Sequence, residues 1–182
     1  MQPTERSQLS LFQLATQYYA SGRFAALSGI LPVSGNLLHH AIEMYLKGAL
    51  APVLDLKAMR KLRHDLQQIW VCAKQSFPSS NLIRFDTAID RLNPFERLRY
   101  PDAVLREGAQ MRLTRLRSEW LPAPANPGRT EPVYDLVLEE VDELVKAIFS
   151  VANLNPAFFS SGLNPRALAV LSEANPHAIF GA

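Results

Sequence analysis

The sequence is poor in cysteine, has no long apolar run and carries almost no net charge. Its one cysteine, Cys72, cannot form a disulfide within the chain, and its place in an apolar helical pattern predicts a buried core side chain. No group of Cys and His residues has zinc-finger spacing. No stretch reaches the roughly 18–20 apolar residues of a membrane-spanning helix. We therefore expect neither a disulfide framework nor a metal or cofactor site, and no membrane partner.

The remaining totals are those of one ordinary globular domain with a tail. The chain has 182 residues, of which 48% are hydrophobic and 20% are charged. Its net charge of +2 argues against strong non-specific binding of nucleic acid by the whole surface. Residues 1–10 lack the apolar stretch of a signal peptide, so we expect a cytoplasmic protein.

The chain is organised around one segment, residues 36–50, which has the pattern of a central helix. At 100° per residue, its apolar side chains cover about half of the circumference or more. The polar residues of the segment share the narrow remaining strip; they are His39, His40, Glu43 and Lys47. A helix with so wide an apolar face is packed against on two or more sides. We expect accessible side chains at His39, Glu43 and Lys47, and buried ones at Leu38, Ala41, Ile42 and Tyr45.

Apolar spacing and breaks at Pro, Gly and Asn predict the other elements. In the first part we expect a helix over 8–20 ended by Ser21-Gly22, and a break over 32–36 with Ser34 or Asn36 as N-cap of the central helix. Then follow a basic connector over 55–63, carrying Lys57, Arg60, Lys61 and Arg63, helices over 62–77 and 82–92, and a helical turn over 95–99.

The region over 109–137 changes character. Residues 111–117 alternate partly between apolar and polar, as an exposed strand does. After a Pro-rich loop over 121–132, Val133–Val137 either pairs with the first strand as a hairpin, which we favour, or begins the last long helix, over 138–154. A short helix is predicted over 166–173.

These elements predict a mainly all-α fold, an up-and-down bundle of four to five helices with a small β-hairpin before the last long helix. The bundle is expected over residues 1–156, with the hairpin and loop inserted at 109–137. The tail, 157–182, contains apolar residues that include Phe158, Phe159, Leu171 and Phe180. Such residues must be buried on the bundle or on a second chain, so we expect a homodimer.

Four short motifs follow one another in the first two thirds of the chain. They are Tyr19-Ala20-Ser21-Gly22-Arg23, His40-Ala41-Ile42-Glu43-Met44-Tyr45-Leu46-Lys47, His64-Asp65-Leu66 and Arg97-Leu98-Arg99-Tyr100-Pro101-Asp102. In this order and spacing they resemble the HEPN domain family, over residues 9–102. The resemblance implies an all-α up-and-down bundle that often dimerises. It also implies a protein that functions together with a nucleotidyltransferase or a toxin–antitoxin partner.

Many HEPN proteins are metal-independent ribonucleases that use an Arg, four to six further residues and a His on a late helix paired across a dimer. This sequence departs from that pattern, because after Arg84 its only histidine is His177, in the tail. Arg60 and His64 are separated by three residues and lie at the start of the third helix instead. The catalytic pair of the family is therefore absent from its usual place.

The polar strip of the central helix is the first candidate site. Glu43 lies four residues after His39 and four before Lys47, so it can pair with either of them. One interpretation is an acid/base or phosphate-contacting groove with a histidine, such as His40, as proton carrier. The other, which we favour, is a solvated helix face with an ion pair.

Two further groups also have two interpretations. His64-Asp65 suggests an imidazole oriented by a carboxylate, but neighbouring helical residues point about 100° apart, so we favour a helix start tied to backbone N–H groups. Arg97, Arg99 and Tyr100 either present guanidinium groups to a phosphate or form a packed helix exit with Tyr100 buried.

The arginines of the first predicted strand, Arg112, Arg115 and Arg117, either line a nucleic-acid surface or, as we favour, charge an edge strand against aggregation. For the whole chain we favour a non-catalytic module that binds a nucleotide, RNA or a protein partner. The alternatives are a structural subunit of a toxin–antitoxin pair and a metal-independent ribonuclease with a displaced site. In that site His40 or His64 acts with Arg97 or Arg99. The binding candidates are His39, His40, Glu43, Lys47, His64, Asp65, Arg97, Arg99 and Tyr100.

Overall fold

The computed structural model describes residues 3–122 and 131–180. Within them the α-helices are α1 (Pro3–Leu27), α2 (Leu31–Leu50), α3 (Leu56–Lys61), α4 (Leu66–Ser76), α5 (Asp86–Leu92), α6 (Pro101–Glu107), α7 (Leu138–Ala152), α8 (Pro156–Ser160) and α9 (Pro165–Ser172). The strands are β1 (Gln110–Thr114) and β2 (Val133–Val137). Short 3-10 helices occur at η1 (Pro78–Ser80), η2 (Leu82–Phe85), η3 (Asn93–Arg99) and η4 (Arg117–Glu119).

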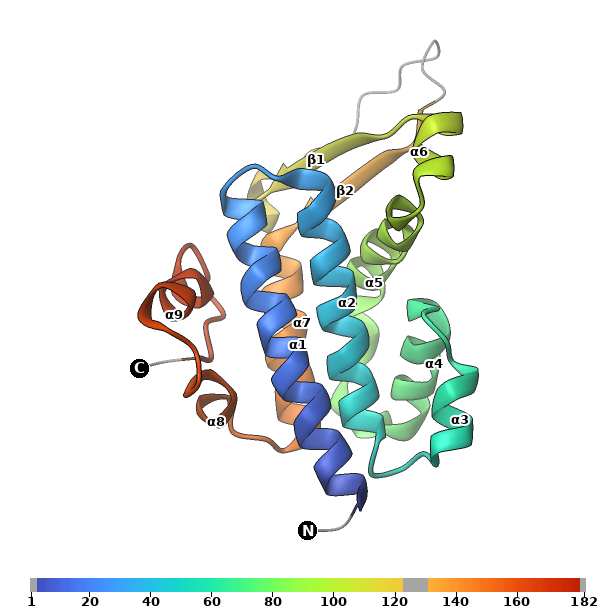
Figure 1. Ribbon diagram of the computed structural model, residues 1–182, viewed down its shortest axis with the longest axis vertical. Coiled ribbons are helices and arrows are strands. Elements are labelled where there is room, and N and C mark those ends of the chain that lie inside the picture. Colours follow the sequence, from blue (N-terminus) through green and yellow to red (C-terminus); the bar gives the residue numbers. More distant parts are fainter. Residues whose placement is uncertain (1–2, 123–130, 181–182) are drawn as a thin grey trace.

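The helices pack around α2, as Figure 1 shows. α1 and α2 form a hairpin of long helices, and α7 and α4 also pack on α2. The α2 side chains predicted to be buried are all fully buried; they are Leu38, Ala41, Ile42 and Tyr45. The mainly helical fold with a central second helix is therefore confirmed. Cys72 is half-buried at the edge of this core, whereas a fully buried side chain was predicted.

The first helix is longer than predicted. α1 does not end at Ser21-Gly22 but continues to Leu27. A Cβ at Gly22 would lie 2.8 Å from side-chain atoms of Leu38, so the bare glycine lets α2 pack closely against α1. Packing against α2 thus outweighs the low helix propensity of glycine.

The central helix also begins earlier than predicted. α2 starts at Leu31 with Pro32 in its first turn, where the missing backbone N–H leaves no helical hydrogen bond unmade. Neither Ser34 nor Asn36 is its N-cap. Ser34 Oγ donates to the Leu31 carbonyl, and Asn36 Nδ2 donates to the carbonyl of Phe95 in η3.

The two strands form a parallel pair, with Gln110 opposite Val133 and Thr114 opposite Val137. A β element before the last long helix is therefore confirmed, but the predicted hairpin is wrong, because a hairpin has antiparallel strands. A parallel pair needs a connection that runs back to the start of the first strand, and the 18 residues between β1 and β2 are enough for this. The predicted loop over 121–132 lies mostly outside the described residues. The sheet lies across the end of the bundle where α1 connects to α2 (Figure 1).

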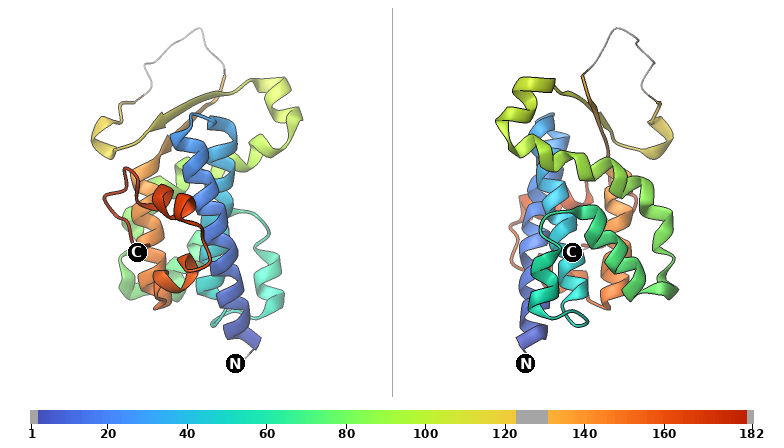
Figure 2. Two further views of the ribbon diagram at one scale, coloured as in Figure 1. Left: turned by 60° about the vertical axis from the view of Figure 1, so that its left-hand side comes forward. Right: turned by 90° about the vertical axis from the view of Figure 1, so that its right-hand side faces the viewer.

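The C-terminal segment packs on its own bundle. α8 and α9 lie beside α1, as Figures 1 and 2 show. Phe159, Leu171 and Phe180 are buried in the common core. Arg23 of α1 fastens this segment, because its fully buried guanidinium pairs with Asp142 of α7 and donates to backbone carbonyls in and just after α9. Most of the apolar surplus of the tail is thus covered within one chain, although Phe158 remains exposed.

Among the described helices, none combines the length and apolar character that crossing a membrane requires.

Candidate functional site

Glu43 is the centre of a polar cluster on α2. Its side chain is fully buried, and the helix places His40 one turn before it and Lys47 one turn after it. His40 Nδ1 lies 3.3 Å from Glu43 Oε2, and Lys47 Nζ donates to Oε1 over 2.6 Å. One carboxylate therefore binds a neighbour on each side along the helix.

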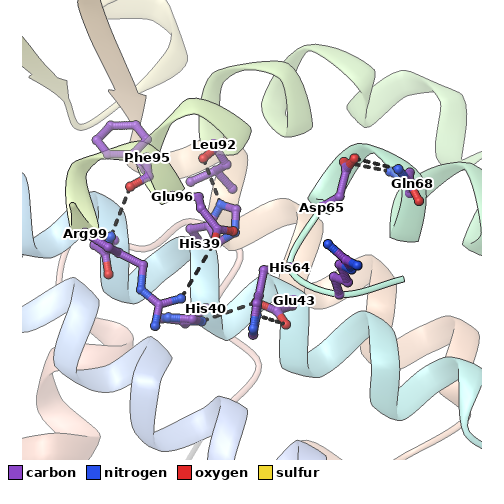
Figure 3. A network of polar contacts seen from close by, with 12 residues as sticks. His39, His40, Glu43, His64, Asp65, Gln68, Leu92, Phe95, Glu96 and Arg99 are labelled. Atoms are coloured by element: carbon purple, nitrogen blue, oxygen red, sulfur yellow. Dashed lines mark hydrogen bonds and ion pairs between the residues drawn. The ribbon is translucent and has the colours of Figure 1, made fainter. Parts of the chain in front are cut away.

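The corner between α3 and α4 supplies a third partner, His64. Asp65 is the N-cap of α4 and accepts a hydrogen bond from the backbone N–H of Gln68. The prediction that His64-Asp65 starts a helix is therefore confirmed. Arg63 has a left-handed backbone with φ of 46°, and its carbonyl accepts a hydrogen bond from Lys47. This turn directs His64 onto Glu43, with 2.9 Å between Nδ1 and Oε1 (Figure 3).

The three partners decide the charge state of Glu43. Burial by itself raises the pKa of a carboxyl group because it removes solvation of the charged form. Hydrogen bonds from His40 and Lys47, with the charges of Lys47 and His64, outweigh burial and lower the pKa of Glu43 from 4.5 to about 2. Glu43 is thus an anion throughout the physiological range.

The two histidines approach Glu43 through the same ring atom. Each places Nδ1 against the carboxylate, and their ring centroids are 6.2 Å apart with planes at 86°. Neither Nε2 has a hydrogen-bond or ion-pair partner in the described part of the chain. The side chain of His64 is 54% exposed and that of His40 is 14% exposed. Glu43 therefore orients two imidazoles that each keep one nitrogen for a ligand or a proton.

The neighbouring His39 has a different environment. Its side chain is 1% exposed, its Nδ1 lies 3.0 Å from the Leu92 carbonyl, and its Nε2 lies 3.4 Å from Oε2 of Glu96. Burial lowers the pKa of His39, against the opposing effects of the Leu92 hydrogen bond and of the Glu43 and Glu96 charges. Because a carbonyl oxygen only accepts, Nδ1 carries the proton of its bond to Leu92. In the neutral ring Nε2 is then an acceptor, and no donor within the described residues bonds to it. Arg99 approaches Glu96 from outside, at 3.7 Å (Figure 3).

The predicted accessibility of the polar strip is therefore wrong for His39 and Glu43, which are both buried. The interpretation as a solvated face fails with it, since only 12% of the Lys47 side chain is exposed. The reason is that other segments cover this side of α2. The end of α5 and the start of η3 lie over His39, and the α3–α4 corner lies over Glu43. A helical wheel identifies a polar strip but not the polar segment that closes over it.

Arg97 and Tyr100 do not join the cluster. Arg97 forms a two-pronged pair with Glu107 of α6, with both oxygens at 2.9 Å. Tyr100 is 56% exposed, so the packed helix exit with a buried Tyr100 is wrong. Arg99 is the member of this group that approaches α2, and it does so through Glu96, which was not among the predicted site residues.

A basic surface lies next to His64. We name it the α3 surface: the exposed side chains of Lys57, Arg60, Lys61 and Arg63. None of these four has a carboxylate partner within the described residues, and they line a shallow hollow of about 530 Å³ together with Leu56. The sequence placed the four charges in a connector, but it gave no signal that a short helix, α3, would present them beside His64.

The arginines of the β1 region are mostly neutralised. Arg112 Nη2 lies 2.5 Å from Asp135 Oδ1, and Arg117 pairs with Glu143 at 2.8 Å. Among these three arginines, only Arg115 has no carboxylate partner in the described part of the chain. The charges of this region are therefore far less available to a polyanion than those of the α3 surface.

Within residues 3–122 and 131–180, no group of three or more His, Cys, Asp and Glu side chains is arranged to hold a metal ion. No family model matches the chain, and comparison with curated proteins and with solved structures found no match.

Proposed function

We propose that this protein is an RNA-binding module whose binding face consists of the α3 surface together with His64 and His40. The observation that carries the proposal is the group of four exposed cations without carboxylate partners beside His64. The total charge of the chain is only +2, so these cations form a local site on an otherwise balanced surface. Local uncompensated Lys and Arg residues are what a phosphate backbone requires.

The cluster behind the α3 surface contributes stiffness and hydrogen-bond donors. Lys47 holds the carbonyl of Arg63, and Glu43 holds the ring of His64, so the end of the basic segment is fixed to α2. The side chain of His64 is 54% exposed, and its Nε2 is then the atom that meets a phosphate oxygen or a base edge. The HEPN resemblance supports the same class of ligand. The homodimer, the cytoplasmic location and a toxin–antitoxin or nucleotidyltransferase partner stay predictions.

Binding to fluorescein-labelled single-stranded RNA, measured by fluorescence anisotropy, tests this function. We expect Lys57→Ala/Arg60→Ala to weaken binding at least tenfold. The matched control is Arg6→Ala/Arg115→Ala, which removes two exposed arginines elsewhere and should leave the affinity within twofold. Equal losses in the two double variants, or no binding by the wild-type protein, would refute the proposal.

A second candidate is metal-independent RNA cleavage, favoured by the placement of two imidazoles on one carboxylate, 6.2 Å apart. In such a reaction one histidine takes the proton of a 2′-hydroxyl, whose oxygen attacks the adjacent phosphorus. The other histidine gives a proton to the departing 5′-oxygen, so a cyclic phosphate and a free 5′-hydroxyl result. In this candidate the two histidines are His40 and His64, and Arg97, which pairs with Glu107, has no role.

Cleavage of RNA in EDTA tests the second candidate separately from binding. His40→Ala and His64→Ala should each reduce the rate at least a hundredfold, and Arg97→Ala should not. A DNA strand of the same sequence should remain intact, because it lacks the attacking hydroxyl. RNA that stays intact with the wild-type protein would exclude this activity and leave the binding proposal standing.

A further inference from the structure

A second pocket, of about 750 Å³, lies between the C-terminal end of α4, the turn through η1 and η2, and the outer side of α7. His177, in the segment after α9, also lines it, and its ring lies 3.4 Å from Glu139. None of the α3 surface residues lines it, and neither do the Glu43 cluster residues. Its volume falls in the range of roughly 300–1,000 Å³ that is typical of sites for small organic molecules. The pocket is therefore a site separate from the proposed RNA-binding face.

The charged wall of the pocket has an excess of positive charge. Lys146 of α7 is exposed and has no carboxylate partner within the described residues. Arg84 lies 3.4 Å from Glu143, but the same carboxylate is already held by Arg117 at the shorter distance of 2.8 Å. Lys146 and Arg84 therefore line the pocket, and its one acidic residue, Glu143, is also paired with Arg117, which lies outside the lining. This excess of positive charge favours an anionic group near Lys146 and Arg84.

The rest of the wall has both polar and apolar parts. Three hydroxyls have no hydrogen-bond partner in the described part of the chain; they belong to Ser76, Ser79 and Ser150. The apolar part of the wall is formed by Phe77, Ala147 and Val151. A ligand that fills this space needs an apolar body besides its charged end, since an inorganic anion would occupy only a small part of it.

We infer that this pocket binds a small organic phosphate, a phosphomonoester with an apolar body. The phosphate lies between Lys146 and Arg84 and accepts from the serine hydroxyls, and the body packs on Phe77 and Val151. Arginine suits this role because its planar guanidinium donates two parallel hydrogen bonds to phosphate oxygens. The inference is independent of RNA binding, because it uses no residue of that face.

Phenyl phosphate is the probe, with inorganic phosphate and phenol as its two halves. Isothermal titration calorimetry gives the affinities, and amide shifts in a two-dimensional NMR spectrum locate the site. We expect phenyl phosphate to bind at least tenfold more tightly than either half. The amides that shift should belong to residues 76–84 and 143–151 and to His177.

Variants distinguish specific binding in this pocket from non-specific attraction of phosphate to surface cations. Lys146→Ala and Arg84→Ala should each weaken phenyl phosphate at least fivefold, and Arg84→Lys should weaken it less than Arg84→Ala does. Arg6→Ala, which removes an exposed arginine of α1 outside both sites, should have no effect. Lys146 is exposed, so its removal leaves the fold intact, which the thermal melting curve checks. Binding by inorganic phosphate as tight as by phenyl phosphate, or shifts spread over all surface lysines, would overturn the inference.

Discussion

Glu43 and His64 lie 21 residues apart in the chain and are joined by a 2.9 Å hydrogen bond between Oε1 and Nδ1. This bond connects the buried face of α2 to the corner that carries the α3 surface. A buried carboxylate is costly unless it is paired and hydrogen-bonded, and Glu43 has Lys47 and two histidines for this purpose. The polar cluster thus fixes the position of the proposed binding face relative to the core.

The charge of Glu43 makes the fold sensitive to acid. Its pKa is about 2 in the folded chain and near 4.5 in the unfolded chain, so the contribution of the charged form is complete above about pH 4.5. That contribution is lost as the pH falls towards 2, and it amounts to about 3 kcal/mol. Glu43→Gln should remove this component. Urea unfolding at pH 6 and pH 3 should therefore show a smaller acid loss in the variant than in the wild type. An equal acid loss in both proteins would contradict the pairing.

Asp65 is expected to stabilise α4 as its N-cap and to have no part in RNA binding or catalysis. Its side chain caps α4, so Asp65→Ala should lower the free energy of unfolding by about 1 kcal/mol. Asp65→Asn keeps an acceptor at the N-cap and should recover most of that loss. RNA affinity should change less than threefold in both variants at a temperature well below melting. An affinity loss in Asp65→Asn as large as that in Lys57→Ala/Arg60→Ala would instead assign Asp65 to the binding face.

Gly35 is required by the contact between α2 and η3. A Cβ at this position would lie 2.0 Å from the ring of Phe95, which is fully buried and has no room to move. Gly35→Ala should therefore destabilise the protein by about 1–3 kcal/mol through overpacking. Gly162→Ala is the control, since nothing lies within 4 Å of its added Cβ. The two melting temperatures decide the prediction, and equal values would show that the contact yields without cost.

The pair of Arg23 and Asp142 is expected to hold the C-terminal segment. Arg23→Met leaves Asp142 buried without its cation, which should cost about 3–5 kcal/mol. The backbone amides of α9 should then exchange with deuterium faster than those of α2, because the carbonyls of Val170 and Glu173 lose their donor. Arg6→Met, which removes an exposed arginine at the other end of α1, should leave exchange unchanged. Unaltered α9 exchange in Arg23→Met would show that apolar packing alone fastens the segment.

Much of the fold could be predicted from the sequence because apolar periodicity reports burial directly. The burial of Leu38 and Tyr45 followed from the α2 pattern. A strand over Val133–Val137 was the favoured of two interpretations, the other being the start of the last long helix, and the structure has the strand. The parallel pairing of β1 and β2 did not follow, because period-two alternation carries no information about strand direction.

The candidate site was predicted in its members but not in its arrangement. His40, Glu43, Lys47 and His64 were all identified, yet Glu43 was expected at the surface. Its burial depends on the α3–α4 corner, whose position is set by the left-handed turn at Arg63. A single sequence gives no strong signal for such a turn at an arginine, because few residues other than glycine and asparagine adopt it.

The salt dependence of RNA binding tests the central claim most directly. For single strands, the logarithm of the association constant falls with the logarithm of salt concentration with a slope of about −0.7 per phosphate neutralised. If Lys57 and Arg60 each contact a phosphate, Lys57→Ala/Arg60→Ala should make the slope less steep by about 1.4. Arg6→Ala/Arg115→Ala should keep the wild-type slope. Parallel lines for the wild type and the α3 variant would contradict the assignment of the α3 surface as the RNA-binding face.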